Sequence, residues 1–229
     1  MIFEPPDLSK EVSDALDDAV DISDWIEEHH PGQIGLTRAA RIAGPCFSIV
    51  LTHREAIMLL LRYDCATSAF ALLRSVYESL CRGLWAEKFL NTPEVAKHFK
   101  AVKGDLKIET IVKALDKGTG EKVYTTQKQA LYSALSDYAH GGLKQIMRWI
   151  SEEEIAPQHT DEEVLEVLWL TNIFALDALA GIARLSELDT TAIDAKRAEY
   201  VAKVAKAHKA KGAGGAADSK PNVLAPIHF

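Results

Sequence analysis

Cysteine is scarce in this sequence, which has only Cys46, Cys65 and Cys81 among its 229 residues. No two of them have the CxxC spacing typical of a zinc site or a redox pair, and each stands among apolar residues. This scarcity excludes a disulfide framework as the basis of the fold. We therefore expect reduced cysteines in an apolar core.

Long apolar runs and a secretory leader are also missing. The longest apolar run lies near residues 57–61, whereas a helix needs about 18–20 apolar residues to cross a bilayer. The N-terminus, MIFEPPDLSKEV, is acidic and does not have the basic-then-apolar order of a signal peptide. These absences predict a cytoplasmic protein that has no membrane partner.

Common catalytic and cofactor motifs do not occur. The sequence has no GxGxxG, no GxxxxGK followed by Ser or Thr, no HExxH and no GxSxG, so the usual nucleotide-binding and hydrolase signatures are excluded. Di-metal sites in helical bundles need paired Glu-x-x-His motifs on inner helices. Glu94 and His98 fall instead on a short helix, and Glu28, His29 and His30 fall at a helix end. We expect neither a metal nor a cofactor.

An excess of positive charge is absent too. The chain has 26 Lys and Arg against 33 Asp and Glu, a formal net charge of −7, which argues against broad, non-specific binding to nucleic acid. Residues 14–28 and 152–166 are acidic. The first half nevertheless collects arginines, namely Arg38, Arg41, Arg54, Arg62, Arg74 and Arg82. This asymmetry predicts a polarised surface that leaves room for a local basic groove.

The segment 66–90, ATSAFALLRSVYESLCRGLWAEKFL, predicts the helix around which the rest of the chain is organised. Its apolar residues recur at three- and four-residue steps, as the buried face of a helix requires: Phe70, Leu73, Val76, Tyr77, Leu80 and Leu84. Arg74, Glu78 and Arg82 form a separate charged stripe at four-residue steps. This stripe is either a structural ion-pair ladder or the floor of a site.

The remaining pattern is helical throughout, so we predict an all-α helical bundle of about seven or eight helices. Residues 1–211 form one domain, and residues 212–229 form a flexible tail rich in Gly, Ala and Ser. Gly44-Pro45 predicts a kink or a break in the second helix. The other helices are expected near residues 9–28, 37–62, 94–101, 107–116, 126–139, 160–188 and 190–211.

A second unusual segment is 136–142, SDYAHGG, in which the glycine pair ends a helix just after His140. An imidazole at a helix C-terminus is favoured as a cation and remains partly accessible. His53, in THREAIMLL, lies on an apolar helix face and is either a hydrogen-bonded core histidine or part of the site. Tyr77, Tyr132 and Tyr138 could hydrogen-bond to the site or serve as packing groups.

The helix motif Leu72-Leu73-Arg74-Ser75-x-Tyr77-Glu78 with the later segment 136–142 resembles uncharacterised bacterial helical families placed near the HEPN superfamily. The likeness covers roughly residues 37–185. HEPN domains are helical bundles, commonly dimeric, and many are metal-independent ribonucleases of toxin–antitoxin, abortive-infection and CRISPR systems. Their catalytic pattern is an arginine separated by four to six residues from a histidine.

His140 matches the histidine of that pattern, whereas Ser133, Ala134 and Leu135 occupy the positions of its arginine. The resemblance therefore implies that Arg74 or Arg82 supplies the positive charge from a neighbouring helix.

RNA cleavage by its own 2′-hydroxyl needs a base of near-neutral pKa and a cation beside the phosphate. The implied function is that of a HEPN-like, RNA-directed effector or ribonuclease in phage defence or a toxin–antitoxin context. Its catalytic residues would be His140, Arg74 and Glu78, and its substrate-binding residues Arg82, Tyr77, Tyr138 and His53.

The alternative is a non-catalytic interaction or ligand-binding module, in which Arg74, Glu78 and His140 form a buried structural network. The implied assembly is a homodimer. A further protein partner could bind the lysine-rich stretch 201–211 and the tail.

Overall fold

A computed structural model describes residues 7–90, 107–139, 146, 149–150 and 159–212, and their regular elements are all α-helices. The all-α class predicted from the sequence is confirmed. The helices of the described part are α1 (Lys10–His29), α2 (Arg38–Arg62), α3 (Ala66–Phe89), α5 (Ile108–Thr119), α6 (Val123–Ala139), α8 (Asp161–Leu185) and α9 (Thr191–Gly212). The short helix expected at 94–101 and the tail 213–229 lie outside the described residues.

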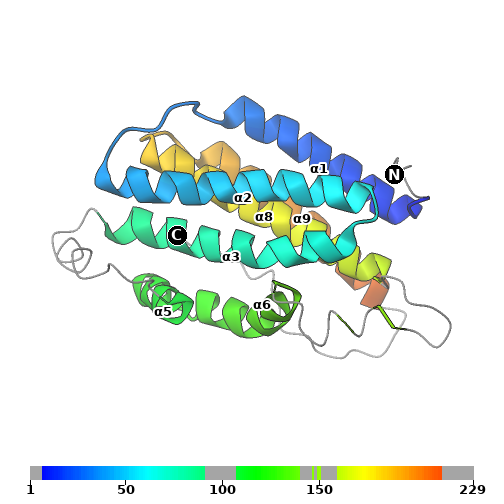
Figure 1. The fold of residues 1–229 in the computed structure, drawn as a ribbon. Helices are drawn as coiled ribbons and strands as arrows, with labels where there is room; N and C mark the ends of the chain where they lie inside the picture. Colours follow the sequence, from blue (N-terminus) through cyan, green and yellow to red (C-terminus); the bar gives the residue numbers. More distant parts are fainter. Residues whose placement is uncertain (1–6, 91–106, 140–145, 147–148, 151–158, 213–229) are drawn as a thin grey trace.

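The helix predicted to organise the chain is central in space. α2 and α3 form an antiparallel pair joined by a short turn at Asp64, whose φ is 54°. α3 contacts α2 and α8 along its length, and α5 and α6 pack against it from the other side (Figure 1). All six of its predicted inward residues are buried: Phe70, Leu73, Val76, Tyr77, Leu80 and Leu84. The periodicity of this segment therefore predicted its buried face correctly.

A single aromatic side chain joins the three central helices. Phe47 of α2 is fully buried and fills the space left by two glycines, Gly83 of α3 and Gly181 of α8. A Cβ atom at Gly83 would lie 2.5 Å from the Phe47 ring, and one at Gly181 would also overlap it. Both glycines are therefore needed because α2, α3 and α8 pack too closely there to admit a side chain.

Pro45 does not break α2, which runs as one helix from Arg38 to Arg62. Of the kink or break predicted at Gly44-Pro45, the break does not occur. Proline removes the hydrogen bond to the carbonyl four residues earlier, here that of Arg41. Both Pro45 and Arg41 are exposed, so water can satisfy that carbonyl and the helix continues at modest cost.

Helix ends follow the signals in the sequence. The Ser9 side chain accepts a hydrogen bond from the Val12 amide at the start of α1, and Thr160 with Glu163 forms a capping box at the start of α8. α6 begins differently, since Asp116 of α5 accepts hydrogen bonds from the amides of Tyr124 and Thr125. The Asp116 carboxylate, which belongs to the preceding helix α5, therefore caps α6.

Two described helices, α2 and α8, are long and apolar enough to cross a membrane by length and composition alone. α8 is mostly buried inside the bundle, which is typical of the core helix of a globular protein. Less than half of the most apolar stretch of α2 is buried. α2 therefore carries apolar residues on a face that the described helices leave uncovered.

Candidate functional site

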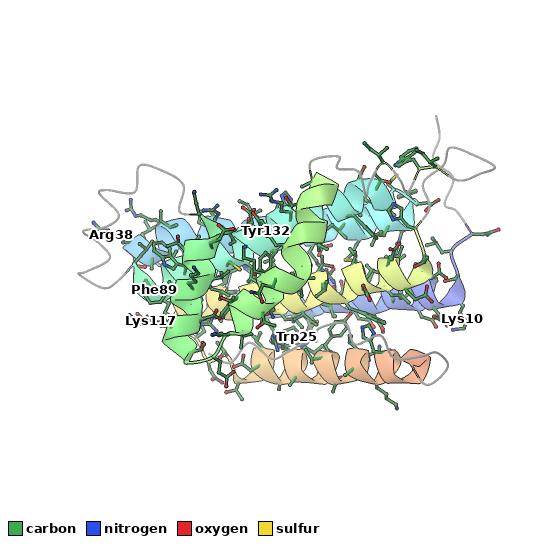
Figure 2. All side chains as sticks on the ribbon, turned by 90° about the horizontal axis from the view of Figure 1, so that it is seen from below. Lys10, Trp25, Arg38, Phe89, Lys117 and Tyr132 are labelled. Carbon is green, nitrogen blue, oxygen red and sulfur yellow. The ribbon has the colours of Figure 1, made fainter. Side chains whose placement is uncertain are left out.

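The predicted charged stripe of α3 lies against α6, whose Tyr132 is labelled in Figure 2. The side chains of Arg74, Glu78 and Arg82 are 22%, 21% and 33% exposed, so water reaches each of them only partly. Tyr132 and Ser136 of α6 lie against them, one helical turn apart. The stripe is therefore the α3 side of a partly buried polar seam between two helices.

Arg74 is held by every nitrogen of its guanidinium. Nε donates to Glu78 Oε1 at 2.9 Å, Nη1 to Ser136 Oγ at 3.0 Å, and Nη2 to the Tyr132 hydroxyl at 2.8 Å. The Tyr132 hydroxyl in turn donates to Glu78 Oε1 at 2.8 Å. This closed arrangement fixes the planar fork of the arginine and ties α6 to α3.

Glu78 is the central acceptor of the seam. Besides Arg74 and Tyr132, Nη2 of Arg82 lies 3.5 Å from its second oxygen, Oε2. Burial opposes ionisation of Glu78 and is the largest single influence, but the hydrogen bonds from Arg74 and Tyr132 and the nearby positive charges together lower its pKa. The pKa of Arg74 is raised, chiefly by its hydrogen bond to Glu78. Both groups are therefore charged at neutral pH.

The Tyr132 ring lies between two cations. The guanidinium carbon of Arg74 is 5.0 Å from the ring centroid, and Nζ of Lys128 is 4.8 Å from it. Lys128 also pairs with Glu109 of α5 at 3.0 Å. Burial, followed by the hydrogen bond to Glu78, raises the pKa of Tyr132. Among the described side chains of the seam, three cations, Arg74, Arg82 and Lys128, stand against two carboxylates, Glu78 and Glu109.

The other predicted site residues have different surroundings. Tyr77 is fully buried, and its hydroxyl donates to the backbone carbonyl of Tyr124 at 3.3 Å, so it packs in the core beneath the seam. His53 is only partly buried on α2, and the core position expected for it belongs to its neighbour Arg54. His140 and the side chain of Tyr138 lie outside the described residues, which follow α6 as far as Ala139.

The sequence also made predictions about the three cysteines and about metal binding. The three cysteines are free thiols; Cys81 is buried, whereas Cys46 and Cys65 are only partly so. Burial raises the pKa of Cys81 to about 12. Within the described part of the chain, no cluster of three or more His, Cys, Asp or Glu side chains could hold a metal ion.

Sequence reasoning missed a buried arginine network around Arg54, whose side chain is fully buried. Its Nε and Nη2 donate to the Asn172 side-chain oxygen of α8 at 2.9 and 2.8 Å. Its two Nη groups also donate to Ser23 Oγ and to the Ala19 carbonyl, both on α1. Nη1 pairs as well with Glu55, 2.5 Å away. Arg54 therefore joins α1, α2 and α8 through one polar centre in the core.

α8 also anchors α9 by buried polar pairs. Asn172 Nδ2 donates to the Tyr200 hydroxyl at 2.8 Å, and Arg197 forms a two-pronged ion pair with the buried Asp177. The signal for these contacts is present in the sequence, because Thr171, Asn172 and Asp177 interrupt an otherwise apolar helix. A polar residue at such a position must find a partner.

Comparison with known proteins gives one family. A model described as Family of unknown function (DUF6988) matches residues 47–209, which include α3, α5, α6, α8 and most of α2 and α9. No curated protein and no solved structure matches the chain. The whole seam of α3 and α6 falls inside the matched range, whereas α1 falls outside it.

Proposed function

Because the chain belongs to this family of unknown function, we propose a function from the geometry of the seam: a non-catalytic helical module that binds an anionic partner without cleaving it. The main evidence is the set of hydrogen bonds that Arg74 makes. Its three nitrogens already donate to Glu78, Tyr132 and Ser136. A guanidinium that stabilises a reacting phosphate must aim its donors at the charge that develops on the phosphate oxygens.

The anionic nature of the partner follows from the local charge. Among the described side chains, Arg74, Arg82 and Lys128 outnumber the carboxylates Glu78 and Glu109, and the stripe remains partly accessible to water. In a protein with a formal net charge of −7, such a patch attracts a phosphate-rich partner locally without making the whole surface a non-specific binder. RNA is the partner class that the HEPN resemblance implies.

A second candidate is the RNA-directed ribonuclease of that resemblance. One observation favours it, namely that Ser136, in the last turn of α6, contacts Arg74. The helix that leads towards His140 therefore ends over the charged stripe. In this candidate His140 removes the 2′-hydroxyl proton, Arg74 or Arg82 stabilises the phosphate, and Glu78 orients the arginine.

Binding and cleavage of a labelled mixed RNA pool separate the two candidates. The native chain should retain RNA on a filter without shortening it, and Arg82→Gln with Lys128→Gln should weaken binding by at least about tenfold as phosphate contacts are lost. Arg38→Gln, which removes an exposed arginine at the start of α2, is the matched control and should change binding little.

Time-dependent cleavage that His140→Ala abolishes at an unchanged melting temperature would establish the ribonuclease instead. A chain that neither binds nor cuts the pool, under low-salt conditions that favour phosphate contacts, would contradict both candidates.

A further inference from the structure

The outward face of α2 has an uncharged stripe that the described helices do not cover. Its largest residues are Ile49, Leu59 and Tyr63, which are 40%, 60% and 42% exposed. Pro45 and Thr52 are exposed too, and Ala56 is partly buried. In Figure 1, α2 lies in front of α8, and none of the stripe residues is among the buried residues of α2. Exposed apolar residues aligned on one helix face are a mark of an interaction surface.

The spacing of this stripe is that of a coiled-coil seam. Its members are separated by four, three, four, three and four residues: Pro45, Ile49, Thr52, Ala56, Leu59 and Tyr63. The five steps average 3.6 residues, so the stripe stays on one face of the helix, and their alternation of four and three matches the a/d spacing of a coiled-coil seam. The buried side of α2, by contrast, is formed by Phe47, Val50, Arg54, Ile57 and Leu61. α2 therefore has one face for its own bundle and a second face for another helix.

Charged residues along one edge of the stripe indicate which partner binds this face of α2. Glu55 and Arg62 are seven residues apart, so they occupy equivalent flanking positions with opposite signs. Arg62 is exposed, and the Glu55 side chain is 51% exposed while its Oε1 accepts from Arg54 and Ser23. A face with one acid and one base at equivalent positions is complementary to its own inverted copy.

We infer that this face of α2 binds α2 of a second copy of the chain in an antiparallel, two-fold symmetric pair. In this register Leu59 packs beside Ala56 of the second copy. Glu55 of each copy then lies across from Arg62 of the other copy, so the two-fold symmetry produces two identical ion pairs. A parallel pair would instead place Glu55 across from Leu60. The inference is independent of anion binding at the seam of α3 and α6.

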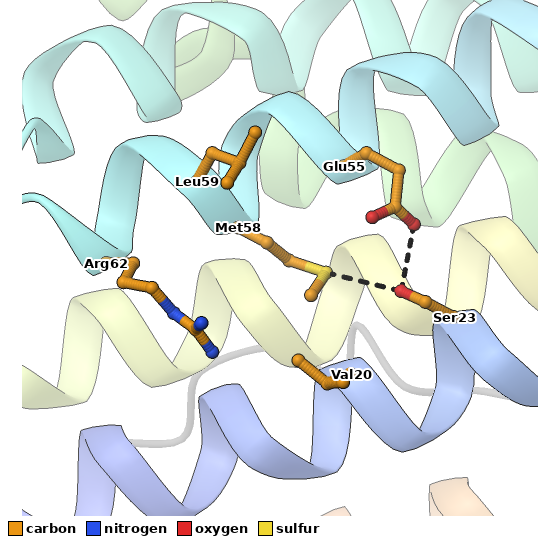
Figure 3. Close-up of a pocket in the computed structure, with 6 residues that line it drawn as sticks. All are labelled: Val20, Ser23, Glu55, Met58, Leu59 and Arg62. Carbon is orange, nitrogen blue, oxygen red and sulfur yellow. Dashed lines mark hydrogen bonds between the residues drawn. The ribbon is translucent and has the colours of Figure 1, made fainter.

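The surface beside Leu59 is also shaped to receive side chains. A hollow of about 200 Å³ lies between α1 and α2, and in Figure 3 Arg62 and Glu55 occupy its two ends with Met58 between them. A second hollow, of about 480 Å³, is lined by Leu59, Leu60, Tyr63 and Cys65. Leu59 borders both. An exposed leucine between two open depressions leaves room for side chains of a second helix.

The oligomeric state in solution tests the pairing. The full chain should sediment as a dimer at micromolar concentration, and Leu59→Glu should raise the dissociation constant at least about 30-fold while leaving the melting temperature of the monomer nearly unchanged. The matched control is Leu188→Glu, since Leu188 is 50% exposed in the turn between α8 and α9 and should leave the dimer intact.

A charge exchange tests the antiparallel register. Arg62→Glu and Glu55→Lys should each weaken self-association at least about tenfold, because like charges then face each other in both copies. Mixing the two variants should restore a dimer that contains one chain of each, since every pair then has opposite signs. Melting curves of both variants check that Arg54 keeps its buried contacts.

Four outcomes would overturn the inference. The native chain could remain monomeric at tens of micromolar, or the dimer could survive Leu59→Glu. The mixture of charge variants could also fail to pair although both are folded. Flotation of the native chain with vesicles of phosphatidylcholine and phosphatidylglycerol, lost in Leu59→Glu, would assign the face to a membrane surface instead.

Discussion

At the scale of single residues, two arginines that look alike in the sequence have opposite surroundings. Arg54 is fully buried among uncharged acceptors of α1 and α8, with one carboxylate at its edge, whereas Arg74 lies in a seam that water reaches. Burial is the main influence on Arg54 and lowers its pKa, while the bond to Glu78 raises that of Arg74. Arg54 therefore stabilises the packing of the core, whereas Arg74 both holds α6 against α3 and belongs to the candidate site.

Replacing Arg54 tests its role in the core. Arg54→Ala should lower the free energy of unfolding by roughly 3 kcal/mol or more, because it takes the two Arg54 donors from the buried Asn172 oxygen and opens a cavity. Urea denaturation measures the loss. Arg38→Ala, at an exposed position of the same helix, should cost less than about 0.5 kcal/mol, and equal losses for the two variants would contradict the buried role.

The seam predicts a pH dependence through Glu78. Since the folded state lowers its pKa, ionised Glu78 stabilises the fold above its unfolded pKa of about 4.3, and this contribution disappears as pH falls through the lower folded value. Glu78→Gln should therefore cost roughly 1–2 kcal/mol at pH 7 and progressively less below about pH 4.

Urea titrations at several pH values measure the Glu78 effect, with the exposed Glu27→Gln as control. A Glu78→Gln deficit that is the same at every pH would argue against a charged role for this residue.

At the scale of helices, the short distance between α2, α3 and α8, rather than the area of their contact, decides how these three helices pack. Phe47 occupies the space that Gly83 and Gly181 leave open on α3 and α8. Gly44, in α2 itself, has no such neighbour, because the nearest atom outside its own chain neighbours, Ile34 Cδ1, would be 3.4 Å from its Cβ. Only Pro45, the next residue, disfavours a side chain there, since proline crowds the Cβ of a preceding helical residue.

Alanine substitutions should separate these positions. Gly83→Ala should destabilise the fold by about 1–3 kcal/mol through overlap with Phe47, even though alanine favours a helix by about 1 kcal/mol over glycine. Gly44→Ala should cost less than Gly83→Ala, because only the restriction that Pro45 places on the preceding residue opposes it. Adding Phe47→Leu to Gly83→Ala should recover part of the loss, as measured by thermal unfolding, and a double variant no better than the sum of the singles would exclude the clash.

Helix periodicity predicted the elements well but not their partners. The inner residues of α3, the Ser9 cap and the Thr160 capping box could be read from local spacing, since each depends on residues within one or two turns. The pairing of Arg74 with Tyr132 and Ser136 spans about sixty positions and depends on where α6 docks, which no local pattern encodes.

On α2, periodicity predicted a broad apolar face but could not tell which of two neighbouring positions it buries. His53 and Arg54 lie about 100° apart around the helix, and the buried one proved to be the arginine.

At the scale of the whole molecule, the bundle is closed by α9, which packs on α8 through Asp177–Arg197 and Asn172–Tyr200. Burial is the largest influence on Asp177 and raises its pKa, although Arg197 acts in the opposite direction. An ion pair at this depth contributes less to net stability than to positioning, because both groups lose their hydration. Its main role is to fix where α9 lies.

A double-variant cycle tests this role. Arg197→Met alone should cost roughly 3–5 kcal/mol, because it strands a buried carboxylate, whereas Asp177→Asn with Arg197→Met should regain more than half of that loss. Urea denaturation of the four proteins gives the coupling. Hydrogen exchange of the α9 amides should rise most in the single variant, and unchanged exchange there would mean that apolar contacts alone hold α9.

The contribution of α1 to Arg54 bears on how the protein can be shortened. The family match begins at residue 47, yet the Ser23 hydroxyl and the Ala19 carbonyl that receive the Arg54 donors come from α1. A recombinant fragment of residues 47–209 alone would lack α1. The apolar surface that α1 covers would then be exposed, and the Arg54 guanidinium would lose its two acceptors on α1. Expression boundaries for any excised domain should therefore start before Ser9, which caps α1.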